Sequence, residues 1–140
     1  HRNVNLFSNV IETNSLDAYY NLFSVDTSLY WKGHFTFCKA SKKGTKLLTR
    51  PFIDLLLINT IIPIKFTYAK FCGQNIEDSI ISLIESIASE NNSIINKFNS
   101  LKLVSTTALQ SQGLIQLKNE YCNKNKCLQC AIGSSILYGN

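Results

Sequence analysis

The chain has 140 residues, of which 45% are apolar and 16% are charged, and its formal net charge is +5. This length fits one compact domain with one apolar core. The longest apolar stretch, residues 52–66, is interrupted by Asp54, Asn59, Pro63 and Lys65, so its uninterrupted part is too short for a membrane span and no membrane partner is expected.

The first residues and the cysteines suggest the origin and the cellular location of the chain. It contains no methionine and opens on His1 and Arg2, so we expect a piece of a longer protein. The 5 cysteines are an odd number and cluster near the C-terminus, which is not a disulfide framework. A reducing, cytoplasmic location is predicted.

The N-terminal third predicts two short amphipathic helices followed by an aromatic segment. Apolar residues recur at helical spacing in residues 6–11 and again in residues 16–23. His34 then lies among Tyr30, Trp31 and Phe35. A histidine in such surroundings is either a packed, hydrogen-bonded side chain or a metal ligand. The alternation from Phe35 to Cys38 is too short to define a strand.

Basic side chains concentrate in residues 30–70, where Asp54 is the only acid. The weak candidates for contacts with nucleic-acid phosphates are Lys39, Lys42, Lys43, Lys46 and Arg50. The spacing of a phosphate-binding P-loop is absent, and no RNA-binding or helix-turn-helix signature accompanies the run. A solvated loop is the alternative interpretation of this segment.

The apolar stretch 52–66 predicts a central buried helix. Pro51 suits the first helical position, and Asp54 in the first turn meets the positive end of the helix dipole. Apolar residues lie on nearly every side, which is typical of a helix buried all round. Pro63 is expected to kink the helix near Asn59, predicted to be a satisfied core amide.

Further helices are predicted from residue 76 to the cysteines, with Asn75 or Gln74 and then Asn92 as caps. Gly113 inside the last helical run suggests close packing against another backbone. The predicted fold is therefore all-α: a single compact, bundle-like domain over residues 1–140, built around a buried, proline-kinked central helix.

Three cysteines lie within nine residues, at Cys122, Cys127 and Cys130. Thiolates at Cys-x4-Cys-x2-Cys spacing can point at one zinc ion, and plant-type ferredoxins use the same spacing for an iron–sulfur cluster. A fourth ligand is needed, for which Cys38, Cys72 and His34 are the candidates. Packed free thiols are the alternative, since cysteine is often buried as a small apolar side chain.

Several short motifs, taken together, resemble one family. They are Tyr30-Trp31-x-x-His34-Phe35, Leu57-Ile58-Asn59-Thr60-x-x-Pro63-x-x-Phe66-x-Tyr68, Glu90-Asn91, Ser111-Gln112-x-Leu114-x-Gln116-Leu117-Lys118 and Tyr121-Cys122-x4-Cys127-Leu128-x-Cys130-x-Ile132-Gly133. The combination looks like the C-terminal part of a bacterial family known as domain of unknown function 2851. The resemblance implies a longer cytoplasmic protein with an N-terminal region that could hold a nuclease-like centre, and it implies no activity for this piece.

The residues show no catalytic constellation, so we expect a non-catalytic helical accessory or interaction domain whose partner is the N-terminal region of the same protein. Cys122, Cys127 and Cys130 would add a structural metal site. Two alternatives stay open: a nucleic-acid-binding module serving a nuclease-like region, which would use the basic segment, and a thiol or iron–sulfur redox module.

Overall fold

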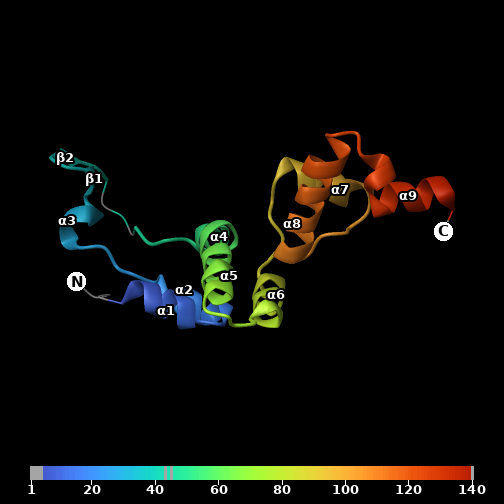
Figure 1. Cartoon of the computed structure of the whole chain (residues 1–140). Coiled ribbons are helices and arrows are strands. Elements are labelled where there is room, and N and C mark those ends of the chain that lie inside the picture. Colours follow the sequence, from blue (N-terminus) through green and yellow to red (C-terminus); the bar gives the residue numbers. More distant parts are fainter. Residues whose placement is uncertain (1–4, 43, 45, 140) are drawn as a thin grey trace. The chain divides into compact units, whose positions relative to one another are not determined.

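The computed structural model describes residues 5–42, 44 and 46–139, and the chain divides into two compact units, residues 1–83 and 84–140. Helices make up most of both units, and within the described residues the one sheet is a short two-stranded hairpin (Figure 1). The predicted all-α fold class is confirmed. The assignment of residues 1–140 to a single domain stays a prediction.

The first unit begins with short helices and a small hairpin, and then forms one long helix. In chain order it contains α1 (Leu6–Glu12), α2 (Leu16–Leu22), α3 (Leu29–Lys32), β1 (His34–Thr36), β2 (Lys39–Ala40), α4 (Arg50–Leu56), the π-helical segment Leu57–Ile61 and α5 (Ile62–Phe71). The two N-terminal helices lie where the apolar spacing predicts them. The antiparallel pairing of β1 with β2 falls where the sequence alternates too briefly to decide.

The long helix from Arg50 to Phe71 changes its hydrogen-bond pattern in the middle. Pro51 stands in the first turn, as the sequence predicts, and Thr49, which the sequence analysis did not single out, caps the start. Pro63 has no N–H to donate to the carbonyl of Asn59, and the N–H of Ile62 donates instead to the carbonyl of Leu57, five residues back. The helix therefore continues through a π-helical turn at the place where the sequence predicts a disturbance.

The burial of this helix differs from the prediction, because only one of its sides is covered within the unit. The buried side chains repeat every four residues: Ile53, Leu57, Ile61, Lys65 and Ala69, joined by Ile62. On the opposite side, Phe52 and Leu55 are about half exposed, at 52% and 47%. Asn59 is exposed as well, although its amide donates to the carbonyl of Leu55 (2.9 Å). The prediction of a helix buried all round is therefore wrong.

The helix α6 (Glu77–Ser86) spans the division between the units, and the second unit continues with shorter helices. These are α7 (Ser93–Leu101), α8 (Ala108–Gln116), the π-helical segment Leu117–Cys122, the 3-10 turn Cys127–Gln129 and α9 (Ala131–Tyr138). Asn92 caps α7 as predicted, because its Oδ1 accepts from the N–H groups of Ile94 and Ile95 (3.1 and 3.0 Å). The sequence interpretation did not extend to α9.

Polar side chains hold the loops of the second unit. The carboxylate of Glu90 accepts from Nε2 of Gln112 (3.0 Å), and the N–H of Glu90 donates to Oγ of Ser111 (3.4 Å). Ser111 is fully buried. Two of the short motifs that carry the family resemblance, at residues 90–91 and 111–118, therefore meet in space and join the loop before α7 to α8.

We predict that Leu57→Ala lowers the free energy of unfolding by about 2–5 kcal/mol, because Leu57 is completely buried and its loss leaves a cavity. Leu55→Ala, two residues earlier in the same helix and 47% exposed, is the matched control and is expected to cost clearly less. Urea denaturation followed by circular dichroism measures both. Equal losses for the two variants would contradict the assignment of the buried side.

Candidate functional site

The predicted phosphate-binding side chains are only partly free. Lys39, in β2, and Lys42 are exposed, whereas Nζ of Lys46 donates to the carbonyl of His34 (2.6 Å) and lies 3.6 Å from the ring centre of Phe35. The guanidinium of Arg50 lies over the ring of Tyr20 (4.9 Å). Lys43 lies outside the described residues. Among the described candidates, Lys39 and Lys42 at the hairpin are thus the cations available to a phosphate.

His34 belongs to an aromatic cluster formed by α3 and the hairpin. Its ring is stacked parallel to that of Tyr30 (4.1 Å between centres), and its Nδ1 lies 2.8 Å from the carbonyl of Tyr30. The hydroxyl of Tyr30 accepts from the N–H of Cys38 (3.1 Å), and Trp31 meets Phe37 edge to face (5.0 Å). These contacts support the interpretation of His34 as a packed side chain.

The cysteine cluster is spread over three elements of the second unit. Cys122 ends a π-helical segment and is exposed, Cys127 opens the 3-10 turn and is exposed, and Cys130 is buried at the start of α9. Among residues 5–42, 44 and 46–139, no group of three or more His, Cys, Asp or Glu side chains is arranged to hold a metal ion. The structure therefore does not bring the three thiols together as ligands, and the zinc and iron–sulfur sites stay predictions.

The candidate fourth ligands, Cys38, Cys72 and His34, all belong to the first unit. Both of these cysteines are exposed. Cys38 has a left-handed backbone (φ 58°) at the turn of the hairpin, where it serves the geometry of the turn. The alternative interpretation, a buried thiol packed as a small apolar side chain, is supported for Cys130 and for none of the other four cysteines, which are exposed.

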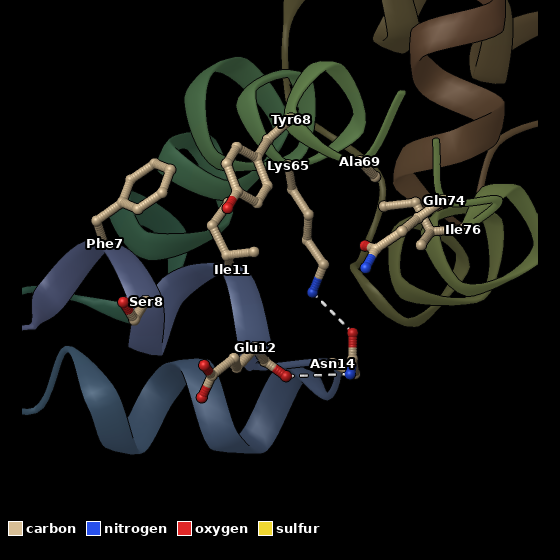
Figure 2. A pocket seen from close by; sticks show the side chains of 10 residues that line it. All are labelled: Phe7, Ser8, Ile11, Glu12, Asn14, Lys65, Tyr68, Ala69, Gln74 and Ile76. Carbon is tan, nitrogen blue, oxygen red and sulfur yellow. Dashed lines mark hydrogen bonds between the residues drawn. The ribbon is translucent and has the colours of Figure 1, made fainter. Parts of the chain in front are cut away.

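A pocket of about 400 Å³ in the first unit contains a buried lysine (Figure 2). Nζ of Lys65 reaches from α5 to the turn between α1 and α2, where it donates to the carbonyl of Thr13 and to Oδ1 of Asn14 (2.7 Å). The hydroxyl of Tyr19, which is fully buried, lies 2.8 Å from the carbonyl oxygens of both Val10 and Thr13 and shares its one hydrogen between them. Two donors thus converge on the C-terminal end of α1.

This lysine is the site residue that sequence reasoning missed. Lys65 is only 4% exposed, and its burial lowers the pKa of its ammonium group. Buried lysines of lowered pKa can act as general bases or form imines. Here the ammonium is held by two oxygen acceptors, which favours a structural role at the end of α1. The sequence feature that could have predicted its burial is the spacing: Lys65 comes four residues after Ile61, on the buried side of the helix.

A second hollow on the first unit is apolar and open. The groove of about 480 Å³ is lined by Phe7, Pro63, Ile64, Thr67, Tyr68 and Phe71, none of which carries a charge. Phe7 of α1 meets Tyr68 of α5 edge to face (5.4 Å). Phe71 is 89% exposed and Ile64 is 47% exposed. This groove lies on the side of the long helix that the unit leaves uncovered.

By length and composition alone, the helix Arg50–Phe71 is long and apolar enough to cross a membrane, so the expectation that this stretch is too short for a span does not hold on that criterion. The same test is passed by core helices of soluble proteins. Two contacts tie this helix to the rest of the first unit: Asp54 accepts from the Tyr20 hydroxyl (2.7 Å), and Lys65 is buried against the α1–α2 turn. One side of the helix is thus already covered by protein.

Alanine substitutions at Gly133 and Gly113 are expected to change the free energy of unfolding in opposite directions. A Cβ at Gly133 would lie 2.3 Å from the carbonyl oxygen of Cys127, so we predict that Gly133→Ala destabilises the protein by about 1–3 kcal/mol. At Gly113 no other described atom lies within 4 Å of the Cβ position, its own helix backbone aside. The expectation of close backbone packing there is wrong, and Gly113→Ala should stabilise by about 0.5–1 kcal/mol. Denaturation in urea measures both variants, and a stabilised Gly133→Ala protein would contradict the packing described.

Comparison with known proteins gives one result. No curated protein and no solved structure matches the chain. The sequence model of one family, described as "Protein of unknown function (DUF2851)", matches residues 1–93. These residues include the aromatic hairpin, the long helix and the buried lysine. Since the match covers more than half of its residues, the chain belongs to the DUF2851 family of proteins of unknown function.

Proposed function

We propose that this chain is a helical interaction domain, and that the open side of helix 50–71 binds an amphipathic helix from another region of the same polypeptide. The observation that carries the proposal is the uncharged groove between α1 and α5, with Phe71 and Phe7 at 89% and 55% exposure. Contiguous exposed apolar side chains on a folded unit mark binding surfaces. The role is one of binding, with no reaction assigned to it.

The backbone that carries the groove is held in place by buried contacts on its other side. Ile64, Tyr68 and Phe71 project from one helix whose opposite side is anchored by buried Leu57 and Lys65. Phe7 comes from α1, which the Lys65 and Tyr19 hydrogen bonds hold in place. Little conformational entropy is then lost on binding, because the backbone that carries these side chains is already ordered.

The chemistry of the groove specifies the occupant. Its aromatic and aliphatic lining fits apolar side chains that recur every three or four residues along an amphipathic helix. Lacking charged groups, the groove gives a free, charged peptide no long-range attraction. A segment of the same polypeptide is favoured because its tether supplies a high effective concentration without such attraction.

Site-specific photocrosslinking tests this proposal. A benzophenone amino acid at Ile64 or at Phe71, in the full-length polypeptide expressed in its own cells, should crosslink to a segment of the same polypeptide outside this chain. Thr60 is the control position, because it is exposed on the same helix and does not line the groove. Ile64→Ser should abolish crosslinking from Phe71 while leaving the melting temperature of this chain nearly unchanged, since Ile64 is already 47% exposed.

Three results would contradict the proposal. Crosslinks only to lipid would assign the side chains to a membrane, and crosslinks only to a second copy of this chain would assign them to self-association. Equal crosslinking from Thr60 and from Phe71 would show that the groove has no specific occupant.

A further inference from the structure

The hairpin of the first unit combines exposed aromatic rings with free cations. Phe35 is 75% exposed, Phe37 is 77% exposed and Tyr30 is 42% exposed. Lys39 and Lys42 are exposed on β2 and just after it. Residues 27–53 contain five lysines and one arginine and no acidic residue. A hairpin that carries both exposed rings and exposed cations differs in kind from the uncharged groove of α1 and α5.

Contacts within the cluster hold these rings in fixed orientations. Phe37 meets Trp31 edge to face (5.0 Å, 66° between planes), and Trp31 in turn meets Tyr30 (5.0 Å). Tyr30 is held by its stacking on His34 and by the N–H of Cys38. Phe37 thus contacts the cluster along one side and is open to solvent over most of its surface. A ring supported in this way is a stacking platform.

The loop that follows the hairpin is tied back to α3 by backbone hydrogen bonds, and one of its cations covers a ring. The N–H of Ser41 donates to the carbonyl of Gly33 (2.8 Å), and the N–H of Gly44 donates to the carbonyl of Lys32 (3.2 Å). Lys46 is bound to the carbonyl of His34 and covers Phe35. Lys42, which lies between the two tied residues, remains exposed.

We propose that this hairpin binds single-stranded nucleic acid, with a base stacked on Phe37 and neighbouring phosphates paired with Lys39 and Lys42. Aromatic platforms beside basic grooves bind single strands with little sequence preference, because every base presents a π-face. A duplex keeps its bases stacked inside, so the rings gain nothing from it. The proposal does not depend on the protein partner of the groove, which occupies other residues.

An anionic membrane surface is the competing ligand, because it also attracts lysines and buries aromatic rings. The hairpin favours nucleic acid, since its rings are locked by contacts with one another and its polar groups, the Tyr30 hydroxyl and the His34 ring, lie in the same cluster. Two substitutions separate the ligands. Leucine keeps apolar area for a membrane but offers no ring for a base, whereas tyrosine keeps the ring.

The test measures binding of a fluorescent twenty-nucleotide oligothymidylate, its duplex with oligoadenylate, and vesicles of phosphatidylserine and phosphatidylcholine. The single strand should bind at low salt more tightly than the duplex. Phe37→Leu should weaken single-strand binding by about 5- to 150-fold, the effect of removing one stacked base, and Phe37→Tyr should restore most of it. Phe35→Leu is the matched control: Phe35 is similarly exposed, but its ring lies under Nζ of Lys46, so its loss should weaken single-strand binding less than Phe37→Leu.

Salt dependence tests the cations separately. Lys42→Gln should reduce the slope of log affinity against log salt by about 0.7, the value for one phosphate contact on a single strand. Lys102→Gln, an exposed lysine in the second unit, is the control with the same change of charge and should leave the slope unchanged. The proposal is overturned if no single strand binds at low salt, if Phe37→Leu binds as the unchanged protein does, or if vesicles bind and strands do not.

Discussion

The first unit depends on a buried ammonium group at the end of a short helix. Nζ of Lys65 and the hydroxyl of Tyr19 donate to oxygens in the last turn of α1, at Val10, and in the α1–α2 turn, at Thr13 and Asn14. Carbonyls at a helix C-terminus lack internal donors, and a cation there also meets the negative end of the helix dipole. A seven-residue helix has little stability of its own, so this anchoring decides where α1 lies.

The same contact fixes the rotation of helix 50–71. Because Lys65 faces α1 and α2, residues spaced four apart from it, such as Ile61 and Ala69, are buried with it. Ile64 and Phe71 are then left on the open side. The proposed binding groove is therefore a consequence of the anchor: the contact that buries a lysine leaves an apolar surface without cover.

The sequence predicted the helices well and their surroundings poorly. The predicted caps act locally, and the structure confirms them: Asn92 caps α7, and Oδ1 of Asn75 accepts from the N–H of Glu77 at the start of α6. Burial depends on which elements meet, and that information is not local. Lys65 looked like an interruption of an apolar run, although its place four residues after Ile61 puts it on the buried side. Leu55 and Phe52 belong to the same apolar run and were therefore expected in the core, although both are about half exposed.

The candidate site shows the same division. Short spacing predicted that Cys122, Cys127 and Cys130 could converge. They lie on a π-helical segment, a 3-10 turn and the start of α9, and their convergence on a metal stays a prediction. The basic segment was recognised from composition, while the ring platform beside it was not. Phe37 is held by its contact with Trp31, and the hairpin turn beside it contains Cys38 in a left-handed conformation. Residues other than glycine rarely adopt that conformation, so the sequence does not predict the turn.

The most direct measurement of the central claim is hydrogen exchange on a Lys65→Met variant, which keeps an unbranched apolar side chain as far as Cε and removes the ammonium. The account predicts faster exchange at the amides of α1 and α2, because the α1–α2 turn loses one of its two donors, while the amides of α7 in the second unit keep their protection. Unchanged protection, or slower exchange, in α1 and α2 would show that the ammonium group does not hold this turn and would contradict the account.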